Sequence, residues 1–359
     1  MKIMISSDGP HAHFFIRTGW ARVLSALGHN VILWDIHEKN AFDAFDEFEP
    51  DMFFGQTYNL NDALYKCIKE RPHLKVMMKA SDWGEMQKSI DPEQYGVLFA
   101  NDEEKKLVEK LKAETGKPDF LHIYYPESCV STTHNGWEET GCRTVSIMNG
   151  ADLFVYTGGR QKPEYKCDLS FIGGYWPYKA RNMDRYLMPL THPLGKYNIK
   201  FFGNQGWPGC HYMGWIPDEE VKHMLKSSTI CPNVSEPHAT DFGFDVNERT
   251  FKILANECFC ISDYVDSMAK EVYTNDEVVF AKTPEEFHEL VEHFVKYPDE
   301  RIPYMKRGYQ TVMKKHTYFH RVSKMLEEFD MPEEAEKCLD IYSQIKPDLG
   351  VMVRILHLA

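Results

Sequence analysis

Short apolar stretches alternate along the first half of the chain with longer segments in which apolar residues recur every third or fourth position. A short apolar run bounded by turn residues is typical of a buried strand, and the longer spacing is typical of an amphipathic helix. Because apolar strands that alternate with helices are covered on both faces, the pattern predicts a parallel, doubly wound sheet. The predicted strands are 2–7, 30–36, 51–56, 76–82, 97–102, 120–126 and 144–149, and the predicted helices are 14–27, 61–71 and 103–115.

The alternation stops at residues 150–168, which are rich in glycine and polar residues and are predicted to link two domains. A second series of the same kind follows, with strands at 169–174, 199–204, 229–234, 259–264 and 277–281 and helices at 180–188, 217–228 and 283–297. We therefore expect an α/β protein with two tandem Rossmann-like doubly wound domains that face a cleft. The expected parts are an N-terminal domain at 1–150, a C-terminal domain at 151–315 and a helical tail at 316–359 that returns to the first domain.

The composition is that of a globular protein, because 43% of the residues are apolar and 26% are charged. The length of 359 residues is enough for two ordinary domains. The net charge of −13 disfavours generic binding to nucleic acid or to an anionic membrane. The nine cysteines show no zinc-ligand spacing, so we expect reduced thiols and a cytoplasmic protein. The first residues lack a signal-peptide pattern, and no apolar run is long enough to span a bilayer.

Several common catalytic and cofactor motifs are absent from the chain. There is no G-x-G-x-x-G after the first strand and no G-x-x-x-x-G-K-[ST], which argues against a dehydrogenase and a P-loop enzyme. There is no G-x-S-x-G nucleophile motif, and no D-x-D of the kind that holds a metal and a diphosphate. We therefore expect neither a metal nor a resident cofactor.

Residues 241–264 combine a glycine-containing turn, a helix and a buried strand. Asp245 is predicted to cap the helix, and Glu248 is predicted to complete a capping box. The helix carries Arg249 and Lys252 on its polar face. A loop followed by a helix N-terminus with basic side chains suits an anion such as a diphosphate. The alternative is a capped surface helix in which Glu248 and Lys252 form an i,i+4 ion pair.

The second domain holds three more candidate features. Gly173 and Gly174 follow a buried strand, where the absence of side chains lets a backbone approach a ligand closely. Lys179 and Arg181 come at the next helix start, where cations can neutralise a phosphate leaving group; the alternative is ordinary surface charge. Trp215 has the ring to stack on a nucleobase, and core packing is the alternative.

The first domain offers polar residues after its predicted strands. Asp8, His11 and His13 follow the first strand, and Asp82 ends the fourth. Ligands of doubly wound sheets bind at the carboxyl ends of the strands, so these residues are candidates for a general base or an acceptor contact. The histidines have no identifiable third metal ligand, and a turn-capping role for Asp82 is the alternative.

Four segments resemble the CgeB-like (spore-maturation-protein-like) glycosyltransferase family, which has the two-domain GT-B fold. They are DLSFIGGYWPYKAR, VNERTFKILANECFCISDY, EVVFAKTPEEFHELVEHFVKYPDER and KKHTYFHR. The resemblance covers roughly residues 150–325, and for the first domain it extends only to the architecture. Its most specific pieces are Asn247, Arg249 and Phe251 of N-x-R-x-F, and the H-T-Y-x-x-R that begins at His316.

This resemblance implies that the second domain binds a nucleotide sugar. Gly173 and Gly174 would face the diphosphate, and Lys179 or Arg181 would pair with it. Sugar, phosphate or ribose would be contacted by the turn Phe242, Gly243, Phe244 and Asp245 and by the helix start Asn247, Glu248, Arg249 and Thr250. Lys252 stands where the family usually has a glutamate assigned to the ribose, and Glu257 stands where it usually has glycine. Either Glu248 takes the ribose role or donor binding differs, with Lys252 as an added phosphate contact.

The function expected from these observations is metal-independent transfer of a sugar from a UDP- or GDP-linked donor to a saccharide or glycan. Kinship with the family favours retention of configuration, and an inverting enzyme would need a base from the first domain. A nucleotide-sugar epimerase of the same architecture and a non-catalytic nucleotide-sugar-binding protein are the alternatives. A modified nucleic-acid base is a further acceptor option, which the acidic charge opposes.

Overall fold

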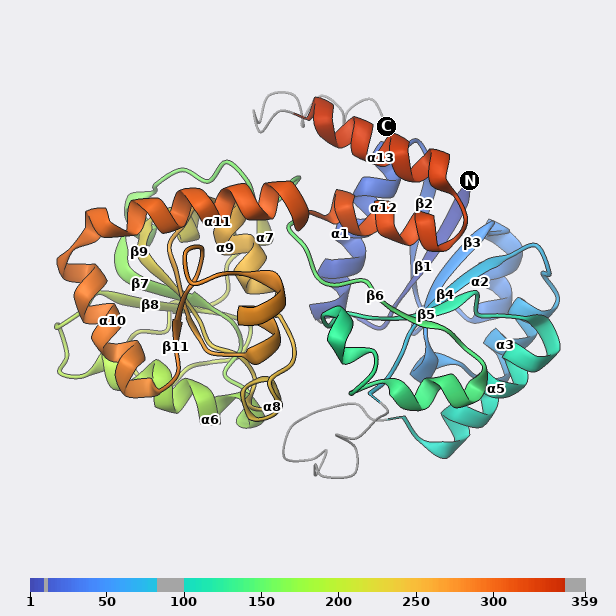
Figure 1. Ribbon diagram of the computed structural model, residues 1–359, viewed down its shortest axis with the longest axis horizontal. Helices are drawn as coiled ribbons and strands as arrows, with labels where there is room; N and C mark the ends of the chain where they lie inside the picture. The colour runs from blue at the N-terminus through green and yellow to red at the C-terminus, as the bar shows by residue number, and fades with distance from the viewer. Residues whose placement is uncertain (10–11, 83–99, 346–359) are drawn as a thin grey trace.

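The computed structural model describes residues 1–9, 12–82 and 100–345. Within these ranges the chain forms two lobes side by side, each with a parallel sheet at its centre and helices around it (Figure 1). This is the α/β architecture of two Rossmann-like domains with a helical C-terminal region, as the apolar pattern predicts. No described helix has the length and apolar character that crossing a membrane requires.

In its described residues the N-terminal lobe has six strands, all paired in parallel, in the order β2-β1-β3-β4-β5-β6. Its elements are β1 (Lys2–Ser7), α1 (Ala12–Ala26), β2 (Asn30–Asp35), α2 (Ala41–Phe48), β3 (Met52–Gln56), α3 (Asp62–Lys69), β4 (Lys75–Lys79), α5 (Asp102–Thr115), β5 (Phe120–Ile123) and β6 (Thr144–Ser146). Ile3 and Ile5 pack with α1, whereas Met4 packs with α2, α3 and α5 on the other face. Both faces are buried, which explains why the centres of these strands are apolar.

The C-terminal lobe has five parallel strands in the order β11-β10-β9-β7-β8. Its elements are β7 (Cys167–Ile172), α6 (Pro177–Tyr186), β8 (Ile199–Phe202), α7 (Asp218–Lys226), β9 (Ser228–Asn233), α8 (Pro237–Phe242), α9 (Glu248–Ala255), β10 (Cys260–Asp263), β11 (Val279–Ala281) and α10 (Pro284–Lys296). Thr283 caps α10 as its sequence predicts, because its hydroxyl accepts from the Glu286 amide at 3.2 Å.

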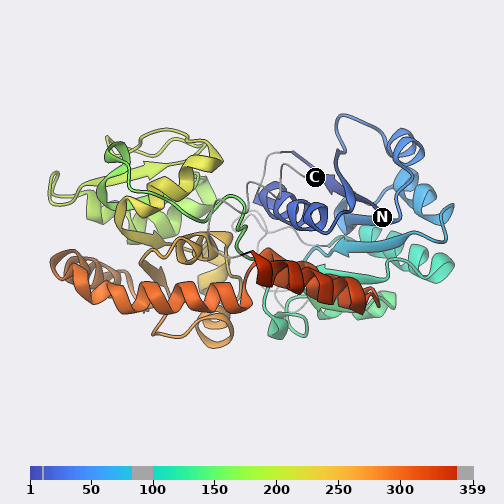
Figure 2. The same cartoon turned by 90° about the horizontal axis from the view of Figure 1, so that it is seen from above.

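The helical end of the chain crosses from the C-terminal lobe to the N-terminal one (Figure 2). It consists of α11 (Ile302–Lys315), α12 (Tyr318–Glu328) and α13 (Pro332–Gln344). The α12 helix packs so closely on α1 that a Cβ atom on Gly19 would lie 2.3 Å from the Tyr318 ring. Lys75 at the start of β4 donates to the Phe329 carbonyl at 3.0 Å, which ties the end of α12 to the first sheet.

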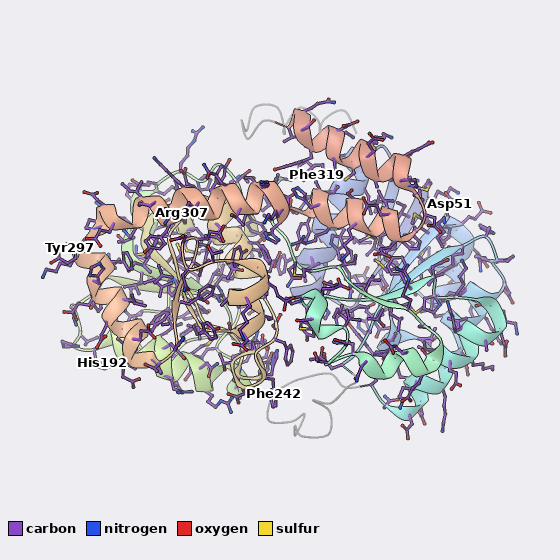
Figure 3. All side chains as sticks on the ribbon, in the orientation of Figure 1. Asp51, His192, Phe242, Tyr297, Arg307 and Phe319 are labelled. Carbon is purple, nitrogen blue, oxygen red and sulfur yellow. The ribbon has the colours of Figure 1, made fainter. Side chains whose placement is uncertain are left out.

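One apolar cluster runs through both lobes and the segment that joins them. It includes Trp20 of α1, Tyr156 of the joining segment, Phe251 of α9 and Met325 of α12. Phe319 of α12, which Figure 3 labels, packs on Phe154 with ring centroids 5.8 Å apart. The segment between the lobes is therefore packed along its apolar side, and it contains one short 3-10 helix at Pro163–Tyr165.

Two local predictions are wrong. Residues 100–102 do not end a strand: Asn101 caps α5, and its side-chain oxygen accepts from the Glu104 amide at 2.9 Å. The rest of the strand predicted at 97–102 lies outside the described residues. Asp245 does not cap α9, because the helix begins at Glu248 with Asn247 in the capping position and Asp245 has a φ of 88°.

Candidate functional site

The carboxyl ends of the two sheets face each other across what we call the interlobe junction. It is formed by Asp82, Tyr125 and His134 of the N-terminal lobe and by Glu236, His238, Phe244 and Asp245 of the C-terminal lobe. Phe244 belongs to the apolar cluster of the N-terminal lobe and meets the Tyr125 ring edge-on at 5.0 Å. Asn149 donates to the Val246 carbonyl at 3.0 Å, so the loop between α8 and α9 is fixed to the opposite lobe.

The paired glycines after β7 are packed against groups of the protein itself. The Gly173 amide donates to the Phe202 carbonyl, and the Gly173 carbonyl accepts from Trp207 Nε1, both at 2.8 Å. A Cβ atom on Gly173 would lie 3.1 Å from Arg249 Nη2, and one on Gly174 would lie 2.6 Å from Trp176 Nε1. The missing side chains therefore make room for a guanidinium and an indole at the carboxyl edge of the second sheet.

Arg249 is a buried clamp between the ends of two strands. Its Nε donates to the Ile172 carbonyl at 2.9 Å, and its Nη1 donates to Asn233 Oδ1 at 2.9 Å and to the Val234 carbonyl at 3.3 Å. The guanidinium also lies over the Phe171 ring, 4.2 Å from its centroid. Burial lowers the pKa of Arg249 to about 10, against the opposing effect of Asp263 and Glu236, so it stays charged at neutral pH.

The two cations at the start of α6 are both paired with acids. Lys179 Nζ lies 2.5 Å from Glu236 Oε1, and Arg181 forms an ion pair with Asp241. Burial raises the pKa of Glu236, but Lys179 and His238 outweigh burial and bring it below the usual value. A diphosphate that engages Lys179 must therefore replace an existing ionised partner.

Lys252 forms the predicted i,i+4 pair, with its Nζ 3.0 Å from Glu248 Oε2, but both side chains are only 13% exposed. The ammonium lies 4.2 Å from the Tyr156 ring centroid and 5.2 Å from that of Phe15 in α1. Tyr318 also donates to Glu248, at 3.2 Å. Burial raises the pKa of Glu248 although Lys252 opposes it. The pair is thus an internal contact between the lobes, not a surface pair.

The loop before α9 places polar atoms at the junction. Asp245 Oδ2 lies 3.7 Å from His238 Nε2. Asn247 Oδ1 is buried and has no hydrogen-bond partner among the described residues, and Thr250 donates to the Asn247 carbonyl at 3.1 Å. Phe242 is partly exposed at the inward-facing edge of the C-terminal lobe, where Figure 3 labels it. The backbone of Asp245 has a φ of 88°, which is strained for an aspartate, and such strain is often found at functional sites.

In the N-terminal lobe, Asp82 is the candidate base that reaches the junction. It is buried just beyond β4, with Oδ1 3.2 Å from His134 Nε2. Burial raises its pKa to about 6, although Lys79 and His238 favour its charged form. Burial also holds the pKa of His134 well below its usual value, so this histidine is neutral at pH 7.

The other first-domain candidates form a separate group. Asp8 lies 3.4 Å from buried Arg17, and His13 Nδ1 lies 3.3 Å from the Tyr58 hydroxyl. His11 lies outside the described residues. Trp215 is 67% exposed, so the core-packing alternative is wrong, and its neighbour Gly214 accepts from the Gly203 amide at 3.2 Å. In the described ranges, no group of three or more His, Cys, Asp or Glu side chains is arranged to hold a metal ion.

Comparisons with known proteins agree with this arrangement. Residues 181–327 match the family model described as "Glycosyl transferase-like". Sucrose-phosphate synthase from Thermosynechococcus elongatus superposes with a TM-score of 0.63 and 10% identity over 92% of this chain and 98% of that one. HepE of Anabaena in complex with UDP superposes with a TM-score of 0.60 and 9% identity over 92% of this chain and 100% of that one. T4 phage BGT in complex with UDP-glucose superposes with a TM-score of 0.53 and 13% identity over 93% of this chain and 99% of that one. The fold is GT-B. A search of curated proteins returned no match.

In this GT-B chain Gly173 and Arg249 of the predicted second-domain residues meet at the ends of β7 and β9, whereas Glu248 and Lys252 lie in a separate contact with the N-terminal lobe. The glycine pair meets Arg249, and Lys179 meets Glu236, which immediately follows this part of the sheet. Residue patterns alone missed Glu236 and His238. The available signal was their place directly after a predicted strand, the position at which doubly wound sheets bind ligands. Tyr125 carried the same signal, since it lies at the end of the strand predicted at 120–126, whereas His134 had none, since only folding brings it to Asp82.

Proposed function

We propose that the protein is a glycosyltransferase that moves a hexose from a UDP-linked donor to a saccharide or glycan acceptor without a bound metal. The observation that carries the proposal is a GT-B fold whose second lobe gathers a glycine bend, Lys179 and buried Arg249 at one sheet edge. The match of residues 181–327 to a glycosyltransferase-like family supports it. So does the presence of UDP or UDP-glucose in structures of similar fold.

The chemical demand of this reaction is stabilisation of the leaving diphosphate, which gains negative charge as the glycosidic bond breaks. Preorganised cations meet that demand without moving during the reaction. Arg249 supplies a fixed positive charge, because its nitrogens are held by strand-end carbonyls. Lys179 is partly exposed, with 26% of its side chain accessible, and could turn from Glu236 to a phosphate. Trp215 offers an exposed ring on which the base could stack.

Asp82 has a different role in each of the two stereochemical outcomes. Inversion needs a base that deprotonates the acceptor from the N-terminal lobe, whereas retention needs no base at that position. We propose retention, as the family resemblance implies, with Asp82 as a hydrogen-bond acceptor for a sugar hydroxyl. NMR of the first-formed product from UDP-glucose is expected to show the α-anomer. A β-linked product would instead assign Asp82 as the base.

The test of the function is a thermal-shift panel of UDP, GDP, UDP-glucose and GDP-mannose, followed by UDP-release assays with and without saccharides. A ligand at 100 times its dissociation constant adds roughly 2.7 kcal/mol of stability, which is a readily measured shift. We expect UDP and UDP-glucose to raise the melting temperature and UDP release to depend on an acceptor. If UDP-glucose binds and no UDP is released, the protein is a non-catalytic nucleotide-sugar-binding protein. The ion pairs of Lys179 and Arg181 are compatible with that alternative too. Conversion of the donor with no acceptor would identify an epimerase, and no shift with any nucleotide would refute the proposal.

A further inference from the structure

A row of alternating charges lies along the interlobe junction next to the proposed diphosphate site. Glu236 uses its two oxygens on different cations: Oε1 lies 2.5 Å from Lys179 Nζ, and Oε2 lies 3.8 Å from His238 Nδ1. His238 Nε2 in turn lies 3.7 Å from Asp245 Oδ2. When His238 is protonated, the order Lys179, Glu236, His238, Asp245 therefore alternates positive and negative charge.

The imidazole of His238 is held in place within this row. Its side chain is 8% exposed, and Nδ1 forms no hydrogen bond with the described residues. The ring lies 5.6 Å from that of Phe244, which is itself packed on Tyr125 of the opposite lobe. His238 therefore has a fixed position beside Glu236, with one ring nitrogen available to it.

Binding of a diphosphate at Lys179 would disturb the row at its other end. An ammonium that turns to the diphosphate weakens its pair with Glu236, and a partly buried carboxylate that loses its counter-ion is destabilised. The remaining cations that act on Glu236 are His238 and Arg249. Arg249 is committed to the Ile172 and Val234 carbonyls, which leaves His238 to compensate the vacated carboxylate.

We propose that His238 is a positioning residue for donor binding, which takes up a proton and, as an imidazolium, holds Glu236 when Lys179 turns to the diphosphate. This inference rests on the proposed function, since it requires a diphosphate at Lys179. The proton that His238 takes up comes from solvent, and no covalent bond to the ligand is involved. Binding of the nucleotide and protonation of His238 are therefore linked.

The charged groups that face His238 agree with this role. In the described part of the chain they are Glu236 before α8, Asp245 after it, and Asp82 from the N-terminal lobe, while Lys179 acts through Glu236. Burial lowers the pKa of His238, but these three carboxylates more than offset burial and raise it above the usual value. Loss of Lys179 from Glu236 strengthens the pull on the His238 proton, so UDP affinity is expected to fall as pH rises above neutrality.

The experiment is calorimetric titration of the full chain with UDP at pH 7.5 in buffers of different ionisation enthalpy. The dependence of the observed enthalpy on the buffer measures protons taken up per UDP bound, independently of turnover. We expect uptake of a fraction of one proton in the wild type. His238→Gln is expected to bind UDP about tenfold more weakly, the equivalent of one pKa unit, and to show no uptake.

Two further variants make the test specific. Glu236→Gln removes both the competitor for Lys179 and the group that His238 compensates, so it should abolish proton uptake without weakening UDP binding. This variant also decides the question if His238→Gln does not fold. His293→Gln is the matched control, because it removes a histidine of α10 whose side chain is 44% exposed and pairs with Glu300 at 2.7 Å. It should behave as the wild type.

The outcomes separate the two proposals. If the wild type does not bind UDP, the proposed function and the role of His238 both fail. If UDP binds without proton uptake, or if uptake persists in His238→Gln, the role of His238 is refuted and the proposed function stands.

Discussion

Replacement of Arg249 by lysine distinguishes a clamp from a ligand contact. Lysine keeps the positive charge, but a single ammonium cannot bridge the acceptors on β7 and β9 that the forked guanidinium joins. Arg249 donates three hydrogen bonds, to the Ile172 carbonyl, Asn233 Oδ1 and the Val234 carbonyl, and its plane lies 4.2 Å from the Phe171 centroid.

The expected cost follows from these contacts. Loss of two of the three hydrogen bonds costs about 1–1.5 kcal/mol each, and loss of the stacked guanidinium costs about 1 kcal/mol more. We therefore expect Arg249→Lys to lower the free energy of unfolding by about 3–4 kcal/mol. For a lobe of this size that is a fall in melting temperature of roughly 6–15 °C.

The assay is thermal unfolding of the variant with and without UDP, compared with Arg307→Lys. Arg307 lies on the outer surface of α11, where Figure 3 labels it, and pairs there with Asp276 at 3.7 Å. An exposed pair of this kind contributes about 1 kcal/mol or less, so this control should unfold close to the wild type. If Arg249→Lys keeps wild-type stability and loses only UDP binding, Arg249 acts chiefly on the ligand, and its role as a clamp between β7 and β9 is refuted.

Three further predictions concern the candidate site. Lys179→Ala should lower UDP-glucose turnover on the order of 100-fold in steady-state kinetics, and unchanged turnover would remove Lys179 from the site. Asp82 has a folded pKa of about 6 and an ordinary value of 3.8, so the wild type loses stability as pH rises from about 4 to 6. Asp82→Asn should therefore be more stable than the wild type at pH 7, by up to about 3 kcal/mol, with no such gain at pH 4. If the variant and the wild type are equally stable at both pH values, the Asp82 carboxylate is not desolvated. Trp215→Ala should leave the melting temperature unchanged and weaken UDP binding about tenfold if the ring stacks on the base, and calorimetry that gives wild-type affinity would exclude stacking.

The fold was predictable because its signals are local. Each strand of a parallel sheet is buried on both faces, so runs such as Met52–Gln56 are mostly apolar and stand out from the chain. The prediction of a helix cap was wrong at a residue type that occurs both at helix caps and in other loop conformations. Asp245 is a good helix cap by type, but its backbone has a φ of 88° and Asn247 takes the capping position.

The site was only partly predictable, because its side chains contact partners that lie far away in the sequence. The basic and glycine residues of the second lobe could be named, but their partners could not. Gly173 is held beside Arg249, and Lys252 beside Phe15 of the other lobe. A pattern reports that a side chain is cationic, but it does not report which carbonyl or carboxylate that side chain meets.

The sequence by itself thus determined two parallel α/β domains, a linker and a helical end, since apolar periodicity and turn residues act within a few positions of one another. The tertiary structure decided which polar groups meet at the junction of the lobes. Asp82 and His238, or Glu236 and Lys179, become neighbours only after both sheets form and Phe244 packs into the opposite lobe. The strength of an interaction between charges depends on their separation and burial, and both of these are set by folding.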